Sequence, residues 1–238
     1  MKIVVFGATG DVGSRVVNEA VMRGHTVKAI VRNEAGLSKL PQSVTGHIMD
    51  VSNPLDVAEA LSGTDVAISS LRTPKGREGE VVALTRSILK GAAIAGQRVI
   101  IVGGAARLRL PNGSPHTVLS DPDFLPADIV PTARASFAQF ELCASTSEAE
   151  WSYASPSALL KPGVRRGKFR RGTDTLLVDA RGNSEISMEN MRLPSWMKPR
   201  LRKRNRPHSR WGIRGRRGAG VGAARASDYV YGLNSGPK

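Results

Sequence analysis

The feature that most constrains the fold lies near the N-terminus, where an apolar run leads straight into three evenly spaced glycines. Residues 3–17 read IVVFGATGDVGSRVV, so Gly7, Gly10 and Gly13 stand between a predicted strand and a predicted helix. Gly7 suits a tight turn, Gly10 lets backbone N–H groups approach a pyrophosphate, and Gly13 allows the helix to pack closely on the strand. A strand, glycine loop and helix in this order predict a dinucleotide site.

The alternation of strand and helix continues through the first 150 residues. Five short runs are apolar throughout, as strands covered on both faces should be. These candidate strands are residues 2–6, 26–31, 46–49, 65–70 and 98–102. The candidate helices are residues 13–24, 54–63, 78–96 and 132–150. Helices of this length between strands imply βαβ crossovers, so we predict an α/β fold with a doubly wound parallel sheet of the Rossmann type.

Two features within this pattern bear on function. Residues 107–131 are rich in Pro and Asp without a sustained period, which is typical of a substrate lid or of a floppy insertion. The single cysteine, Cys143, excludes an intrachain disulfide framework and a multi-cysteine metal site, so we expect no metal and a buried structural thiol. His116, in the long loop, is expected to be a surface residue.

The chain changes character after Asn190. Its formal net charge is +15, but residues 191–238 hold 13 Lys and Arg against one acid, Asp228, whereas residues 1–190 hold 22 against 19. The body, residues 1–190, is therefore one nearly neutral domain, for which nucleic acid is not the expected partner. The tail, residues 191–238, is basic, interrupted by Pro and without hydrophobic period, so we predict that it is irregular, being disordered or loosely packed.

The N-terminus and the apolar runs bear on location. No run approaches the roughly 18 apolar residues that a membrane span needs, and a strand begins within two residues of Met1. We therefore expect a cytoplasmic protein without a membrane partner.

The ends of the predicted strands supply the other candidate cofactor residues. Arg32 stands at the end of the second strand, where NAD sites usually carry an acid for the ribose, so NADP is favoured. If Arg32 is instead a solvated strand-end charge, NAD remains open. Asp50 and Val51 fall where such folds contact the adenine, and Ser69, Ser70 and Leu71 end the fourth strand, where the nicotinamide ribose would lie.

Four segments together resemble one family. They are GATGDVG at 7–13, SSLRTP at 69–74, VIIVGGAARL at 99–108 and SPSALLKPGVRRGKFRRGTDTLLVDARGNSEISMEN at 155–190. These residues resemble the atypical short-chain dehydrogenases of the NmrA-like, NAD(P)H-flavin reductase or biliverdin reductase B-like kind. The resemblance covers residues 1–190 nearly end to end and implies a nicotinamide-dependent reductase in which a planar acceptor stacks on the nicotinamide.

The resemblance also implies roles for individual residues. Arg32 would meet the 2′-phosphate, while Gly103 and Gly104 would line the nicotinamide side. The pyrophosphate loop would be Gly7, Ala8, Thr9, Gly10, Asp11, Val12 and Gly13, and the segment that closes over the cofactor would be Ser155, Pro156, Ser157, Ala158 and Leu159.

One departure from the family's carbonyl-reducing relatives limits the chemistry. Those enzymes use a Tyr-x-x-x-Lys pair to deliver a proton, but none of Tyr153, Tyr229 and Tyr231 has Lys four residues on. Hydride transfer to a flavin or a quinone needs no such pair, since the acceptor delocalises charge and solvent supplies the proton. We therefore expect an NAD(P)H-dependent reductase with a small-molecule electron acceptor, a monomer or homodimer with no assigned catalytic residue. A regulator of the NmrA kind, which senses NAD(P) without turning it over, is the alternative.

The resemblance leaves two interpretations of the tail. In the family, the segment up to Asn190 continues into an acidic helix and a closing strand, which this sequence does not contain. If the codons are read one base differently, the Trp196/Met197 junction must give Asp and the Met197/Lys198 junction Glu, as a frame change near 190–191 would require. An evolved basic arm that binds phosphates is the other interpretation.

Overall fold

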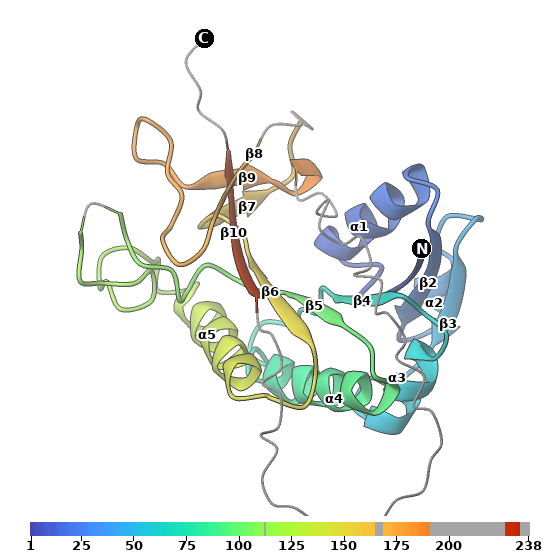
Figure 1. Ribbon diagram of the computed structural model, residues 1–238. Helices are drawn as coiled ribbons and strands as arrows, with labels where there is room; N and C mark the ends of the chain where they lie inside the picture. Colours follow the sequence, from blue (N-terminus) through green and yellow to red (C-terminus); the bar gives the residue numbers. More distant parts are fainter. Residues whose placement is uncertain (112, 165–168, 191–226, 234–238) are drawn as a thin grey trace, which may run out of the picture.

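The computed structural model describes residues 1–111, 113–164, 169–190 and 227–233 (Figure 1). Its strands are β1 (Lys2–Phe6), β2 (Thr26–Val31), β3 (Thr45–Ile48), β4 (Val66–Ser69), β5 (Val99–Val102), β6 (Trp151–Ser155), β7 (Leu159–Lys161), β8 (Phe169–Gly172), β9 (Glu185–Ser187) and β10 (Ser227–Leu233). Its helices are α1 (Asp11–Met22), α2 (Glu34–Leu37), α3 (Pro54–Leu61), α4 (Glu80–Ala95), α5 (Val130–Ala144) and the 3-10 turn η1 (Met188–Asn190). No helix within these residues is long and apolar enough to cross a membrane.

Eight of the strands form one sheet in the order β3-β2-β1-β4-β5-β6-β10-β8. All neighbours from β3 to β10 run parallel, and β8 alone pairs antiparallel, against β10. The strand order reverses at β1, which lies between β2 and β4, so the chain winds outward in both directions from this strand. The predicted doubly wound Rossmann-type sheet is confirmed.

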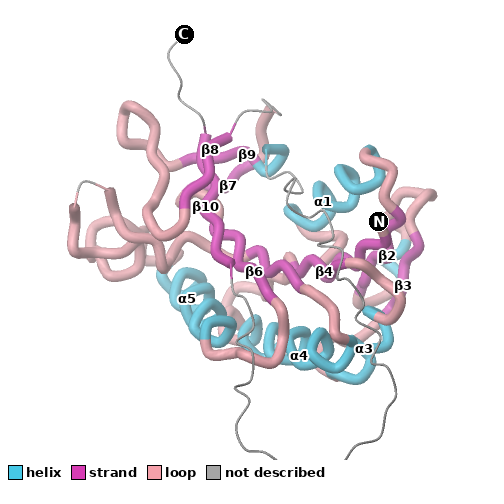
Figure 2. Tube along the Cα trace, viewed as in Figure 1, coloured by secondary structure: helices cyan, strands magenta, loops and turns pink. Residues whose placement is uncertain are grey.

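Helices cover both faces of the sheet (Figure 1, Figure 2). On one face, Ile3 and Val5 of β1 join a buried cluster with Val16 and Val17 of α1. On the other face, β1 contributes Val4 and Phe6 to a cluster that includes residues of α3 and α4, as well as Cys143 of α5. The alternate residues of a buried strand therefore serve two cores, which explains why the strand sequences are apolar without interruption. Cys143 is fully buried, as predicted.

The helix ends differ from the predicted ones where polar side chains intervene. The last predicted helix, 132–150, ends six residues early at Ala144. The hydroxyls of Ser145 and Thr146 donate to the carbonyl of Leu142 at 2.9 and 2.8 Å, which satisfies that carbonyl outside the regular helical pattern. Gly96 ends α4 in the left-handed region, at φ +61°, close to the predicted end.

The long loop after β5 is packed against the rest of the chain. Leu108 and Val118 of this loop form a third buried cluster with Leu176. Backbone hydrogen bonds also join Arg109 to a later segment of the chain. The Arg109 N–H donates to the carbonyl of Asp174, and the Leu176 N–H donates to the carbonyl of Arg109, each at 2.8 Å. A floppy insertion is therefore the wrong interpretation of residues 107–131, whereas the lid interpretation stays a prediction.

The C-terminal part requires a second correction. We predicted an irregular tail without a closing strand, but Ser227–Leu233 forms β10, between β6 and β8. The outer edge of β6 offers a row of backbone donors and acceptors, and the sequence SDYVYGL is rich in residues that favour strands. The rest of the predicted tail, 191–226 and 234–238, lies outside the described residues. Its origin in a frame change stays a prediction.

Candidate functional site

The glycine loop between β1 and α1 is shaped by close backbone contacts. Gly7 has φ +74°, and a Cβ atom there would lie 2.8 Å from the carbonyl oxygen of Ser70. A Cβ on Gly13 would lie 1.9 Å from the carbonyl oxygen of Gly7, so α1 approaches the loop more closely than any other residue type allows. The loop closes on itself through the Gly10 N–H, which donates to the Gly7 carbonyl at 3.1 Å. The first and third glycines therefore have the structural roles that the sequence predicted for them.

The N-terminus of α1 is open to a ligand. Gly10 is the N-cap residue, and no side chain of the described residues caps this end of the helix. The first turn of a helix carries N–H groups without helical partners and the positive end of the helix dipole, which together favour a phosphate. Thr9, Gly10 and Asp11 are exposed at this tip, Val12 is half-buried, and Ala8 is buried in the core.

The parallel strands bring the other predicted site residues to the same edge of the sheet. Because β1 to β6 all run in one direction, their carboxyl ends meet beside the glycine loop. Arg32 is exposed at the end of β2, and Asn33 caps the short helix α2 by accepting from the Gly36 N–H at 3.1 Å. An exposed guanidinium in this place can reach a phosphate group near the ribose.

The two residues predicted after β3 differ in their surroundings. The carboxylate of Asp50 accepts from the N–H and the hydroxyl of Ser52, at 2.9 and 2.8 Å, and these bonds lower its pKa. Asp50 is therefore an exposed, ionised acceptor at this edge. Val51 is buried in the core on the α3 side, so its side chain packs in the core and is not exposed to a ligand.

The serines at the end of β4 divide into two kinds. The hydroxyl of Ser70 donates to the carbonyl of Phe6 at 3.0 Å and thereby ties β4 to the glycine loop. The hydroxyl of Ser69 is buried and has no hydrogen-bond partner among the described residues, and the same holds for Ser155 at the end of β6. Buried hydroxyls are nearly always satisfied, so these two, each at the carboxyl end of its strand, fit a polar ligand at this edge. Leu71, half-buried, follows directly.

Gly103 and Gly104, after β5, lie against a buried tyrosine that the sequence analysis did not place. A Cβ on Gly103 would lie 1.9 Å from the Tyr153 hydroxyl oxygen, and one on Gly104 would lie 2.5 Å from the Ser136 hydroxyl oxygen. The Gly104 N–H donates to the Tyr153 oxygen at 3.4 Å. Close packing against β6 and α5 therefore explains this glycine pair, and no sequence pattern could have indicated it.

The Tyr153 hydroxyl is engaged in structural bonds. It donates to the carbonyl of Ser136 at 3.0 Å, lies 3.3 Å from the Gln139 Oε1, and belongs to a network in which Gln139 donates to Thr85 at 2.8 Å. Burial raises its pKa to about 12, although the bonds from Ser136 and Gly104 act in the opposite direction. A phenol this weakly acidic and this enclosed is a poor proton donor near neutral pH, so Tyr153 does not replace the absent Tyr/Lys pair.

The segment from Ser155 to Leu159 continues from the end of β6 across the same edge. Ser155, Pro156 and Ser157 are buried, whereas Ala158 and Leu159 are exposed. The N–H groups of Ala158 and Leu159 donate to the hydroxyl and carbonyl of Ser184, at 3.1 and 2.9 Å. The segment is therefore held by Ser184, which follows Leu159 by 25 positions and Ala158 by 26. The sequence analysis missed this contact.

The same arrangement of loop, helix and strand ends defines a class of protein. The model of the NAD(P)H-binding family matches residues 7–190, which is most of the chain. The protein therefore belongs to the NAD(P)H-binding family. Its described site agrees with this membership, since the glycine cradle, the open end of α1 and the unpartnered Ser69 and Ser155 hydroxyls all suit a dinucleotide.

Three proteins illustrate what the chain is similar to. YwnB of Bacillus subtilis is 33% identical over 191 residues, covering 79% of this chain and 86% of YwnB. A Burkholderia pseudomallei protein, provisionally described as exported, is 30% identical, with a TM-score of 0.73 over 98% of this chain and 100% of that chain. A Streptococcus pneumoniae protein, provisionally described as an NADH-flavin reductase, has a TM-score of 0.75 at 21% identity, over 98% and 100% of the two chains. The last likeness is one of fold.

Proposed function

We propose that the protein is an NADPH-dependent reductase that passes hydride to a planar acceptor of the flavin or quinone type. The observation that carries the proposal is one edge of the sheet. There the glycine loop, the exposed Arg32 and two buried hydroxyls without a partner among the described residues lie together, while the Tyr153 hydroxyl is bonded to Ser136. When bound, the nicotinamide supplies the hydride. The protein's own residues bind and orient the two reactants.

The binding roles follow from the positions of the residues. The N–H groups of the first turn of α1 bind the pyrophosphate, because they have no cap and lie at the positive end of the helix. Arg32 binds the 2′-phosphate, and the exposed Asp50 lies on the adenine side. The Ser69 and Ser155 hydroxyls bind polar groups of the nicotinamide half.

The acceptor class follows from the state of Tyr153. Reduction of a simple ketone needs a proton delivered to a localised alkoxide, and the Tyr153 hydroxyl already donates to the Ser136 carbonyl. A flavin or quinone spreads the incoming charge over its rings, so water can protonate it without a positioned acid. The name of the Streptococcus pneumoniae protein of similar fold is consistent with a flavin acceptor.

An anaerobic NADPH oxidation assay tests the proposal directly. We expect turnover with FMN or with a benzoquinone, and little turnover with simple ketones. Rapid reduction of a ketone would contradict the acceptor class, and the absence of binding to either NADPH or NADH would contradict the proposed cofactor.

A sensing protein of the NmrA kind is the second candidate, and the enclosed Tyr153 favours it as well. Such a protein would bind NADP or NADPH at the same edge without oxidising it. Tight binding by calorimetry combined with no NADPH oxidation across flavins and quinones would decide for the sensor.

A further inference from the structure

From Ala158 on, the closing segment and β7 are bonded to residues near the end of the body. Strand β7, which begins at Leu159, pairs in parallel with β9, with Leu159 opposite Glu185 and Lys161 opposite Ser187. The Ser187 hydroxyl donates at 3.1 Å to the carbonyl of Val164, which lies three residues after the end of β7. Residues 158–164 and 184–189 therefore form one small cross-linked unit, which we call the closing unit.

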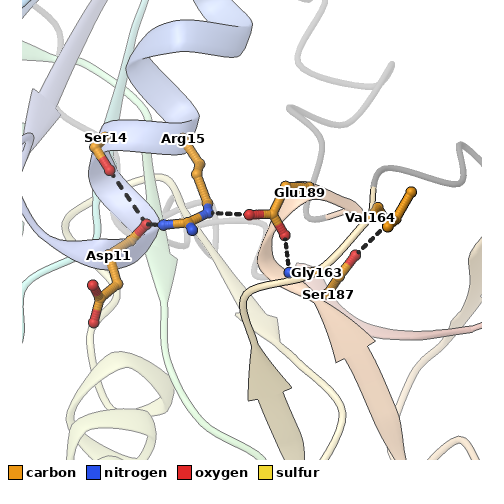
Figure 3. A network of polar contacts seen from close by, with 7 residues as sticks. All are labelled: Asp11, Ser14, Arg15, Gly163, Val164, Ser187 and Glu189. Carbon is orange, nitrogen blue, oxygen red and sulfur yellow. Dashed lines mark hydrogen bonds and ion pairs between the residues drawn. The ribbon is translucent and has the colours of Figure 1, made fainter.

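The closing unit lies on the phosphate-binding helix. Ile186 of β9 is fully buried in the same cluster as Val16 and Val17 of α1. At the edge of this apolar contact, Arg15 Nε of α1 donates to Glu189 Oε1 at 2.7 Å (Figure 3). The cluster therefore includes residues of both the closing unit and α1, and the ion pair joins the two directly.

Glu189 connects both sides of this contact. Its second oxygen, Oε2, accepts from the Gly163 N–H at 2.7 Å, so one carboxylate bonds to both α1 and the residues that follow β7 (Figure 3). Burial acts to raise the pKa of Glu189, but the bonds from Arg15 and Gly163 outweigh it and leave the pKa below its ordinary value. The carboxylate is therefore ionised at neutral pH.

Arg15 reaches from this contact to the phosphate turn itself. Its Nη1 donates to the carbonyl of Asp11 at 2.6 Å, and Asp11 is the first residue of α1 (Figure 3). The chain of bonds runs from Asp11 through Arg15 and Glu189 to Gly163, which lies two residues after the end of β7. It joins the turn that holds the pyrophosphate to the segment that covers the other half of the dinucleotide.

We propose that Arg15 and Glu189 are positioning residues that set the distance between the phosphate turn and the closing segment Ser155–Leu159. The inference rests on the proposed function, in which this segment meets the nicotinamide half. A ligand that spans both halves of the site requires the pair, whereas a ligand that occupies the adenine and phosphate half does not.

The test compares two ligands on matched variants. Glu189→Gln removes the charge at nearly unchanged size, and Glu185→Gln is the control, because Lys161 Nζ and Glu185 Oε2 form a 2.8 Å pair that stays within the closing unit. NADPH probes the whole site, and ADP probes the adenine and phosphate half. We expect Glu189→Gln to weaken NADPH binding about threefold to fivefold, the range of a partly exposed ion pair, and to leave ADP binding unchanged. Glu185→Gln should change neither.

Arg15→Lys provides the second variant, from the helix side. Lys keeps the positive charge near the phosphate turn, but a single ammonium cannot reproduce the two divergent bonds to Asp11 and Glu189. We expect the same selective loss for NADPH.

Other results would contradict the inference. Equal weakening of NADPH and ADP would assign the pair to the phosphate turn alone and overturn the inference, as would a Glu189→Gln variant indistinguishable from Glu185→Gln. If the unchanged protein bound ADP but bound neither NADPH nor NADH, the result would contradict the proposed cofactor and, with it, the proposed function on which this inference rests.

Discussion

The two halves of the site are built in different ways. The phosphate turn is formed mainly by neighbours in the sequence, from Phe6 to Arg15, with Ser70 as a distant support, and its shape depends on backbone atoms that approach within the space of a missing Cβ. The closing unit is formed by residues up to 26 positions apart, such as Gly163 and Glu189, and its shape depends on side-chain hydrogen bonds and ion pairs.

This difference predicts how each half of the site responds to amino-acid substitution. A backbone contact admits no extra atom, because the neighbouring carbonyl cannot move without moving its strand. A side-chain contact at the surface can lengthen or exchange with water at small cost. The phosphate turn should therefore respond to substitution with large losses and the closing unit with small, ligand-specific ones.

The largest effect is expected for Gly13→Ala. The added Cβ would lie 1.9 Å from the Gly7 carbonyl oxygen and 2.7 Å from the Ser70 hydroxyl oxygen, so α1 must move away from the loop. Such overpacking typically costs about 1–3 kcal/mol of folding stability. Because the displaced helix carries the N–H groups proposed to bind the pyrophosphate, we also expect NADPH affinity, measured by calorimetry, to fall about a hundredfold. Gly79→Ala is the control, since φ there is −63° and no atom lies within 4 Å of the new Cβ. Similar affinities for the two variants would contradict the importance of the close contact.

The next largest effect is expected for Arg32→Ala. If Arg32 binds the 2′-phosphate, the loss of a charge-assisted bond costs about 1.5–3 kcal/mol, or about tenfold to a hundredfold in NADPH affinity. NADH affinity should hardly change, because NADH lacks that phosphate. Lys39→Ala removes another exposed charge from the same region and serves as the control. An unchanged ratio of the two affinities in Arg32→Ala would show that Arg32 is a solvated strand-end charge.

The sequence was informative where structure is local. The strand, glycine loop and helix at residues 3–17 could be predicted because glycines at this spacing follow a local pattern, and the structure shows the steric reason at Gly7 and Gly13. The fold class followed from the alternation of short apolar runs with helices. Ser69 and Ser70 could not be distinguished, because the structure alone reveals that Ser70 bonds to Phe6 while Ser69 has no partner among the described residues. The pairing of Glu189 with Arg15 joins residues 174 positions apart, and β10 pairs with strands far away in the sequence, so neither leaves a periodic signal.

An intermediate effect is expected for Tyr153→Phe, which tests whether this residue belongs to structure or to catalysis. Removing the hydroxyl leaves the Gly104 N–H and the Ser136 carbonyl without this partner, which costs about 1–3 kcal/mol in the free energy of unfolding. The catalytic rate should stay nearly the same. A rate profile with a step near neutral pH that vanishes in this variant would instead identify Tyr153 as a catalytic acid.

The pH dependence of unfolding gives the same variant a second readout. Burial raises the Tyr153 pKa to about 12, above the value of about 10 expected in the unfolded chain, so the folded state holds this proton more tightly. The corresponding stability is complete below pH 10 and is lost as the pH rises through 12. Urea unfolding should therefore show a steeper decline over that window in the unchanged protein than in Tyr153→Phe.

The smallest effect is expected for the coupling between Arg15 and Glu189 in global stability, and it sharpens the contrast between the two halves. Their side chains are 29% and 26% exposed, whereas those of Arg77, in the loop before α4, and Glu80, the first residue of α4, form a pair at 2.5 Å and are 65% and 45% exposed. Double-mutant cycles by urea unfolding at pH 7 should give about 0.5–1 kcal/mol for the first pair and at most about 0.3 kcal/mol for the second. The Glu189 pKa lies below its ordinary value, so its contribution is present above the unfolded pKa, near 4.5, and is lost as the pH falls through the folded value. The coupling should accordingly weaken as the pH is lowered from 7 to below 4.5. Equal couplings at pH 7, or a value for Arg15 and Glu189 that does not fall as the pH is lowered, would mean that the apolar cluster around Ile186 holds the closing unit without help from the ion pair.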